Sequence, residues 1–348
     1  MQPVSRLLEH SNRYAWASET RLSLVGRPRC GSIRDVVSRL DPSPAALPVD
    51  DRWPRAGHWL AAGPGERPID LAVLGVPAFT RSIRPNGTRA TPVAVRRALH
   101  HFTTWCASRH VDLADLYPWD LGDVQEPDAD DGEWRTTTMA TTAFAKARAV
   151  VVLGGDGTAT FPVMAAGNVP AGGNGLDAAG LVMLDAFYDV RDGVGNCSSL
   201  RRLVDVGLRP DRIAHLGAAD WLTSRSHAGE VAARGVHLLS RRVIGERGID
   251  ACMREALDVA GGGSANVHVS FDFSVCDRAV APASLDAVPG GLAASDVLAA
   301  AFAAGRDRRV RAIDLVEIDA TADTPDLRTV RLAAMVVLEF AAGLALRP

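Results

Sequence analysis

Residues 270–292 read SFDFSVCDRAVAPASLDAVPGGL, and the apolar run NVHVSFD at 266–272 leads into them. Short runs rich in β-branched and aliphatic residues that end in a polar loop are typical of buried strands in a parallel sheet. We therefore expect a strand over 266–272 that ends at Asp272. His268 falls on the same face of this strand as Asp272, and we expect it to be a core histidine.

The same succession of strand, polar loop and helix continues along the chain from residue 69. It predicts further strands at 69–76, 149–155, 180–186, 212–218 and 310–319. Helical patterns lie between them, at 91–100, 136–148, 198–207, 225–234, 246–259, 293–305 and 327–345. This alternation is typical of an α/β fold in which crossover helices join parallel strands.

Acidic residues stand at the ends of four of these strands: Asp156, Asp185, Asp189, Asp272 and Glu317. In open parallel sheets, ligands bind in the crevice beyond the carboxyl ends of the strands. The sequence therefore predicts that these side chains converge on one acidic crevice.

Composition restricts the classes of protein that this chain can represent. Of its 348 residues, 47% are apolar and 23% are charged, which suits a full-sized core. The net charge of −3 argues against nucleic acid as a partner. Lys146 is the only lysine, so any Schiff base or phosphate-loop lysine depends on that position. The cysteines are scattered without a C-x-x-C pair, which favours a reducing cytoplasm.

No segment reads as a membrane span or a signal peptide. The most apolar stretch, 333–346, is interrupted by Glu339 and is too short to cross a bilayer. Residues 1–68 show no clear strand period and contain one possible amphipathic helix at 31–40. We expect 1–68 to be an N-terminal extension and 69–348 to be the α/β domain.

Several motifs resemble those of a known family. The pattern S-x-D-x-D-x-x-D-P-x-x-A-P…P-G-G-L aligns without a gap with 270–292, G-G-D-H aligns with 154–157, and D-A-H-x-D aligns with 185–189. With the segments at 74–99, 195–207 and 316–319, they resemble the ureohydrolases, the family of arginase, agmatinase and formimidoylglutamase. The resemblance covers roughly 69–346. It implies a three-layer α/β/α sandwich with a mostly parallel sheet of about eight strands.

The resemblance also implies a metal site, and the motifs depart from it. In the family, two Mn²⁺ ions share aspartate and histidine ligands and hold the hydroxide that attacks the substrate. Asp185 and Asp272 match bridging ligands, and Asp189 matches a ligand of a single metal. The remaining ligand positions carry residues that cannot replace the originals: Gly157, Phe187 and Ser274. We expect no tightly bound cofactor, or one weakly bound divalent cation such as Mn²⁺ or Mg²⁺.

Glu317 matches the family glutamate that accepts the guanidinium or amidinium group of the substrate. The alternative is a structural acid paired with a nearby arginine. Phe187 could stack on the same planar cation. Cys197 and Cys276 are candidate nucleophiles for a metal-free reaction, although neither has a histidine near it in the sequence.

These expectations allow three functions. The first is a cytoplasmic protein that acts on or binds a guanidino or amidino compound without a normal dinuclear manganese centre. The second is a catalytically inactive pseudoenzyme with a regulatory or assembly role. The third is a conventional manganese-dependent hydrolase of C–N bonds in amidines or guanidines. The resemblance further implies a homo-oligomer, a trimer or a hexamer.

Overall fold

The computed structural model describes residues 47, 50–61, 67–168, 175–262 and 266–348. All of them belong to one compact unit, 31–348. The amphipathic helix expected at 31–40 lies outside the described residues, as does most of the expected extension. The predicted domain boundary between 68 and 69 stays a prediction. The short helix α3 (Ala56–Leu60) precedes that boundary and contributes Ala56 and Leu60 to the core.

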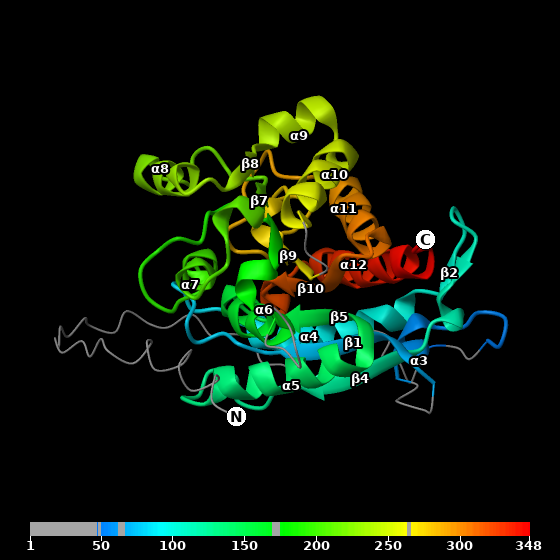
Figure 1. The fold of residues 1–348 in the computed structure, drawn as a ribbon. Coiled ribbons are helices and arrows are strands. Elements are labelled where there is room, and N and C mark those ends of the chain that lie inside the picture. Colours follow the sequence, from blue (N-terminus) through cyan, green and yellow to red (C-terminus); the bar gives the residue numbers. More distant parts are fainter. Residues whose placement is uncertain (1–46, 48–49, 62–66, 169–174, 263–265) are drawn as a thin grey trace. The chain divides into compact units, whose positions relative to one another are not determined.

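An eight-stranded sheet forms the centre of the described unit (Figure 1). Its strand order is β4-β1-β5-β10-β9-β6-β7-β8, and every neighbouring pair is parallel. The strands are β1 (Ile69–Val76), β4 (Pro118–Asp123), β5 (Ala147–Gly154), β6 (Gly180–Leu184), β7 (Ile213–Leu216), β8 (His237–Leu239), β9 (Val267–Asp272) and β10 (Val310–Val316). A separate antiparallel pair consists of β2 (Trp105–Cys106) and β3 (Val111–Asp112). The predicted mostly parallel sheet is confirmed.

Alternate residues along the central strands point into two hydrophobic cores. On β5, Val151 packs in one core and Val152 packs in another on the opposite face, as the two-residue period of a strand requires. The first core is covered by α4 (Thr91–Ala98), α10 (Ile249–Ala260), α11 (Ala294–Arg306) and α12 (Arg328–Ala345). The other face is covered by α5 (Gly132–Lys146), α6 (Thr160–Asn168), α7 (Ser199–Asp205) and α8 (Arg225–Ala233).

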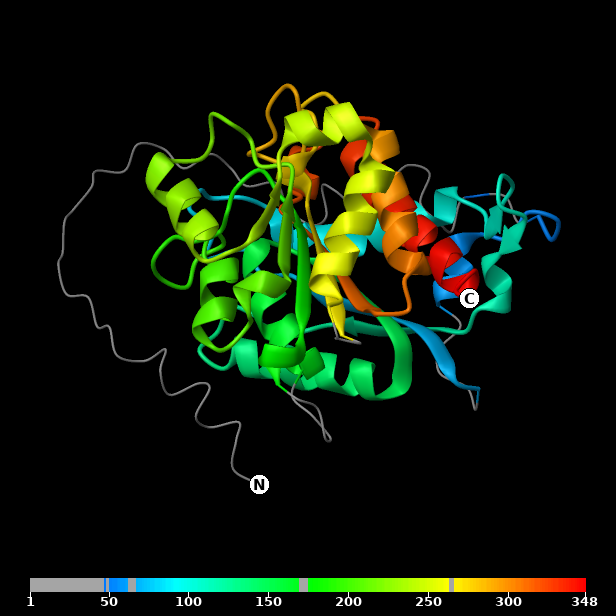
Figure 2. The same ribbon diagram turned by 45° about the horizontal axis from the view of Figure 1, so that its top comes forward.

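Figures 1 and 2 show these helices on either side of the sheet, which confirms the three-layer α/β/α arrangement. The edge strands β4 and β8 were not predicted. The β4 sequence PWDLGD is polar, and β8 has only three residues, so neither shows the apolar run of a buried strand. The helix expected at 246–259 is divided into α9 (Arg241–Arg247) and α10, because Gly248 between them has a φ of 79°.

The helices of the described residues include none that is both long enough and apolar enough to span a membrane. The apolar stretch at 333–346 lies mostly within α12, where most of its side chains are buried in the core.

Candidate functional site

The predicted acids follow the carboxyl ends of four central strands of the sheet. In the order β5, β10, β9 and β6, the strands lead into Asp156, Glu317, Asp272 and Asp185. Neighbouring strands lie about 4.8 Å apart, so acids at their carboxyl ends are close in space. Asp189 follows Asp185 in the same loop. The four aspartates are buried and Glu317 is half-buried. We call this group the acidic crevice.

Three of these aspartates repel one another. Burial raises the pKa of Asp185, Asp189 and Asp272 well above the ordinary value. After burial, the largest cause of each raised pKa is the negative charge of another member of the group. Asp189 raises the pKa of Asp185, Asp272 raises that of Asp189, and Asp185 raises that of Asp272. At an effective dielectric constant of about 20, two like charges 4 Å apart cost roughly 4 kcal/mol. Burial and mutual repulsion therefore both favour the protonated form of these three carboxyl groups.

Ser274 lies against the carboxyl group of Asp185. Its hydroxyl donates to Asp185 Oδ1 at 3.0 Å and accepts from the N–H of Ala186 at 3.2 Å. The N–H of Phe187 also donates to Asp185 Oδ1, at 2.8 Å. The other oxygen, Asp185 Oδ2, is buried and has no hydrogen-bond partner within the described residues. The serine thus occupies one side of the carboxyl group and leaves the other open.

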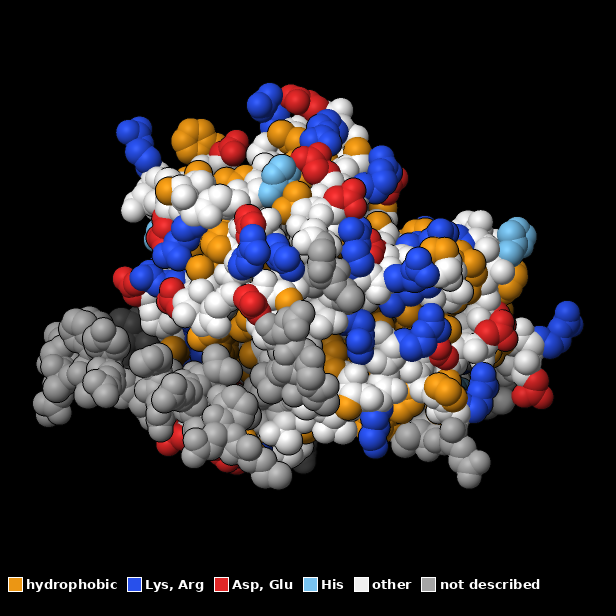
Figure 3. Space-filling model, viewed as in Figure 1, with side chains coloured by type: hydrophobic (Ala, Val, Ile, Leu, Met, Phe, Trp, Pro, Cys, Tyr) orange, Lys and Arg blue, Asp and Glu red, His pale blue; other side chains and the backbone are white. Residues whose placement is uncertain are grey.

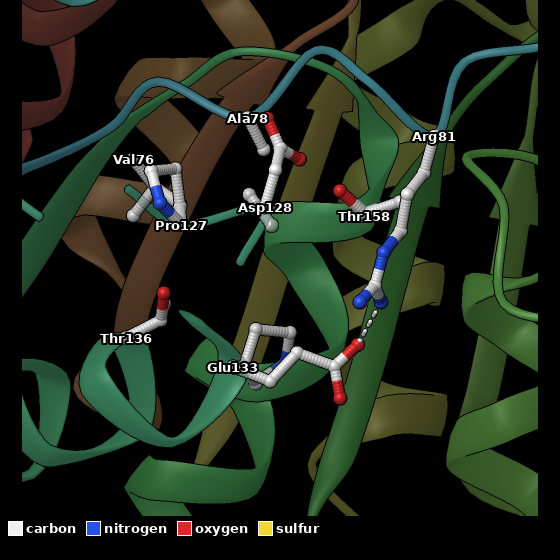
Figure 4. Close-up of a pocket in the computed structure, with 10 residues that line it drawn as sticks. Val76, Ala78, Arg81, Pro127, Asp128, Glu133, Thr136 and Thr158 are labelled. Atoms are coloured by element: carbon white, nitrogen blue, oxygen red, sulfur yellow. Dashed lines mark hydrogen bonds and ion pairs between the residues drawn. The ribbon is translucent and has the colours of Figure 1, made fainter. Parts of the chain in front are cut away.

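Asp156 is held from two sides. Its Oδ2 accepts a hydrogen bond of 2.9 Å from the hydroxyl of Ser82, and its Oδ1 accepts from the N–H and hydroxyl of Thr158. Ion pairs fix the segment that carries Ser82, as Figure 4 shows for Arg81 and Glu133, which are 2.8 Å apart. Arg202 binds the same glutamate through two bonds of 2.9 Å. This network positions the loop after β1 against the crevice.

Glu317 has no arginine partner among the described ion pairs. Its Oε1 accepts from the N–H of Gly157 at 2.7 Å and from the side-chain amide of Asn196 at 2.9 Å. The residue has a φ of 60°, a strained conformation for a side chain of this kind that is found most often at functional sites. Burial, followed by Asp272 and Asp156, raises the pKa of Glu317 to about 8. The expected structural alternative, a pairing with arginine, is not what these contacts show.

Asn196 is a site residue that the sequence analysis did not single out. Besides its bond to Glu317, it accepts a hydrogen bond of 3.3 Å from the N–H of Ile83. The only signal was the match of 195–207 to a family segment that begins with asparagine.

The loop of Asn196 also lies over Gly157. A β-carbon added at Gly157 would come within 2.8 Å of the backbone oxygen of Asn196. Side chains at this position therefore require the loop to move. The loop of Asn196 thus occupies the space that a side chain at position 157 would take.

Phe187 is half-buried and lines a hollow of about 20 Å³ together with Asp189, Cys197 and His227. This volume holds about one water molecule, so a larger ligand has to displace side chains. Glu317 is not among the residues that line this hollow. The carbonyl oxygen of Phe187 lies 2.6 Å from Nε2 of His215. Burial lowers the pKa of His215 to about 4, so its neutral ring donates this bond.

Both candidate nucleophiles, Cys197 and Cys276, have a thiol whose pKa is raised. Burial raises the pKa of Cys197, and the surrounding acids, beginning with Asp189, raise it further. Burial also raises the pKa of Cys276, which is fully enclosed. A thiolate is the reactive form, so neither environment favours a nucleophile. His268 is a core residue as expected, bound through Nε2 to Asp314 at 2.7 Å.

Comparisons with known proteins agree with this fold. A sequence model of the arginase family matches residues 69–343. The chain belongs to the arginase family. A formimidoylglutamase from Halalkalibacterium halodurans is 28% identical over 304 residues, 85% of this chain and 93% of its own.

Two solved structures share the fold of this arginase-family chain. Formimidoylglutamase from Bacillus subtilis subsp. subtilis str. 168 superposes with a TM-score of 0.80 and 24% identity, over 87% of this chain and 95% of its own. Formiminoglutamase from Trypanosoma cruzi, solved with Mn²⁺, has a TM-score of 0.76 and 21% identity, over 85% of this chain and 100% of its own.

The acidic crevice of this arginase-family member lacks part of the aspartate and histidine set that the family motifs imply. The described residues contain no group of three or more His, Cys, Asp or Glu side chains arranged to hold a metal ion. The acidic crevice offers carboxylates without an imidazole, because positions 157 and 187 carry Gly and Phe. Asp185 Oδ1 is already bonded to Ser274 and to the N–H of Phe187. Oxygen donors alone suit weakly held divalent cations.

Proposed function

We propose that this protein binds or acts on a small guanidino or amidino compound in the acidic crevice, without a dinuclear manganese centre. The proposal rests on the burial and the contacts of the Glu317 carboxyl group. Its half-buried carboxyl group interacts with Asp272 and Asp156. It is held by Gly157 and Asn196 and is not neutralised by arginine within the described residues. A planar cation with paired N–H donors is the partner that such a carboxylate recognises best.

The binding step follows from these contacts. Gly157 and Asn196 both donate to Oε1 of Glu317, so the second oxygen remains for a ligand. A cationic ligand favours the ionised form of Glu317, which releases the proton that the ligand-free crevice holds. It also offsets the repulsion among Asp185, Asp189 and Asp272. The similarity to formimidoylglutamases supports an amidino group as the part that is recognised.

A second candidate is a pseudoenzyme that binds such a compound without hydrolysing it. The bonds of Asp185 and the protonated cysteines support it, because the chain then offers neither a metal-activated hydroxide nor a thiolate. A third candidate, the conventional manganese-dependent C–N hydrolase, draws its support from the relatives. For any of them we propose a cytoplasmic homo-oligomer, a trimer or a hexamer.

Thermal unfolding with a ligand panel tests the proposal. The full chain is melted with guanidine, arginine, agmatine, simple amidines and N-formimidoyl amino acids, because a ligand that binds the folded state raises the Tm. We expect at least one class to raise the Tm and Glu317→Gln to remove most of the shift. Gln keeps the acceptor for Gly157 and Asn196 but loses the charge. Glu255→Gln is the matched control, since Glu255 on α10 pairs with Arg247 on α9 and with His237 on β8, and not with a member of the acidic crevice.

Phe187 supplies an independent check. If its ring stacks on the planar cation, Phe187→Ala weakens the same ligand by about 0.5–2 kcal/mol. Combined with Glu317→Gln, its effect is then expected to be non-additive, because in that arrangement both side chains would contact one group of the ligand. A panel that produces no shift with the unmodified protein rejects the ligand-binding proposal.

A further inference from the structure

A second, larger hollow lies at the amino ends of β1, β5 and β10, on the side of the sheet opposite to the carboxyl ends that carry the acids. Its volume is about 620 Å³, within the range of small-molecule sites. Five basic side chains from the end of α5, the start of β5, the loop before β10, β10 and the C-terminal residues line it: Lys146, Arg148, Arg308, Arg311 and Arg347. We call it the basic hollow. Figure 3 shows Lys and Arg side chains gathered around the C-terminus that Figure 1 marks.

Backbone carbonyls hold the guanidinium group of Arg311. One terminal nitrogen donates to the carbonyl oxygens of Phe144 at 3.0 Å and Ala147 at 3.2 Å. Nε of Arg311 is buried and lacks a hydrogen-bond partner in the described part of the chain. Carbonyl oxygens satisfy N–H groups but carry no net charge. The position of Arg311 is therefore fixed while its charge is left without a counter-ion.

Arg347 is held in the same manner. Its Nε donates to the carbonyl oxygen of Gly305 at 2.7 Å, and a terminal nitrogen donates to that of Val310 at 2.8 Å. Burial lowers the pKa of Arg347 to about 10, and the positive charges of Arg148 and Arg311 contribute to the lowering. Two fixed guanidinium groups thus repel each other beneath the hollow, which a bound anion would relieve.

The acids nearby offset only part of this charge. Asp70 pairs with Arg148 at 2.6 Å. Asp307 is engaged by Arg309, at 2.6 Å. Pro348 also lines the hollow.

The remaining two cations are exposed. Lys146 lies 5.2 Å from the ring of Trp119, and Arg308 has no ion pair with any described residue. The positive charge of the five side chains that line the hollow therefore exceeds the negative charge of the acids near it.

We propose that the basic hollow binds a small polyanion that carries phosphate or carboxylate groups. Arg311 and Arg347 form a pre-organised base for one anionic group, since their guanidinium planes are already fixed. Lys146 and Arg308 are long, exposed side chains that can close on a second group. The site is separate from the acidic crevice, which lies at the carboxyl edge of the same sheet, and does not depend on the function proposed for it.

Isothermal titration calorimetry of the full chain tests this site with two probes, inorganic pyrophosphate and citrate. We expect saturable binding of at least one probe, and its affinity should weaken as salt is added, because ions screen exposed charges. The two probes distinguish a phosphate ligand from a polycarboxylate.

The decisive variant is Lys146→Gln with Arg308→Gln, which removes two exposed charges and no described hydrogen bond. We expect this double variant to lower the affinity for the probe about tenfold or more, since each hydrogen bond to a charged group contributes substantially to the free energy of binding. Arg225→Gln with Arg254→Gln is the matched control, because it makes the same change in net charge on α8 and α10. Absence of saturable binding, or equal weakening in both double variants, would overturn the proposal. Arg308→Glu alone is a second variant, and it should abolish binding if the hollow is the site.

Discussion

The hydroxyl of Ser274 donates a hydrogen bond of 3.0 Å to Oδ1 of Asp185. In the family pattern an aspartate stands at position 274, and both side chains would be metal ligands. Here the neutral serine adds no charge and occupies a lone pair of its neighbour. The two positions thus form a hydrogen-bonded pair through Oδ1 of Asp185, while Oδ2 stays buried without a partner in the described residues. This pairing of a neutral serine with a carboxyl group is the basis of our account of the acidic crevice.

Ser274→Ala should destabilise the protein. It removes the donor to Asp185 and leaves the buried N–H of Ala186 without its acceptor. We expect a loss of about 1–3 kcal/mol in the free energy of unfolding, measured by urea denaturation. Ser284→Ala is the matched control, because the hydroxyl of Ser284 is buried without a hydrogen-bond partner in the described residues. Equal effects of the two substitutions would show that the bond to Asp185 contributes little.

Gly157→Ala should also destabilise the protein and weaken ligand binding. The added β-carbon would lie 2.8 Å from the carbonyl oxygen of Asn196, so the loop must shift, and Asn196 is a partner of Glu317. We expect a loss of about 1–3 kcal/mol from this overpacking, measured by denaturation. Gly229→Ala, in α8 with open space around it, should instead stabilise by about 0.5–1 kcal/mol. An unchanged stability for Gly157→Ala would mean that the loop moves freely.

The fold could be predicted from the sequence because its central strands are buried on both faces. β1, β5, β6, β9 and β10 are almost wholly buried and rich in aliphatic residues, whereas the edge strands β4 and β8 are partly exposed. The acids at the strand ends were predictable for the same reason, since parallel strands fix where their ends meet. The contacts of Asn196 with Glu317 and Gly157 were not, because they depend on the path of an irregular loop that has no period.

The titration of Glu317 should make both the stability of the protein and its affinity for a cationic ligand dependent on pH. The pKa of its carboxyl group rises from an ordinary value of 4.5 to about 8 in the folded state. The folded protein therefore holds a proton that the unfolded chain releases, and this contribution to stability is complete below pH 4.5 and is lost as the pH rises through 8. Thermal melts between pH 5 and 9 should show a falling Tm, less steep in Glu317→Gln. The affinity for a guanidinium ligand should change in the opposite sense and rise up to about pH 8. A flat affinity over this range would exclude ionisation of Glu317 upon binding.

Cys197 should react slowly with alkylating agents. Burial and the neighbouring Asp189 raise the pKa of its thiol, so little thiolate exists near neutral pH. Mass spectrometry after timed treatment with iodoacetamide should show less modification at Cys197 than at the half-buried Cys106. Cys197→Ser should retain the ligand-induced rise in Tm. Rapid alkylation of Cys197, or loss of a measured hydrolytic activity in Cys197→Ser alone, would return this thiol to the list of nucleophiles.

The metal content of the protein tests the central claim most directly. The purified chain is saturated with Mn²⁺, dialysed against metal-free buffer and analysed for manganese by mass spectrometry. Because the crevice offers carboxylates without imidazole and Asp185 is bonded to Ser274, we predict well below about one Mn²⁺ per chain. Phe187→His with Ser274→Asp should raise that content, whereas adding Gly157→His should not raise it further because Asn196 blocks the position. Retention of about two Mn²⁺ per unmodified chain would contradict the account and restore the family's metal centre.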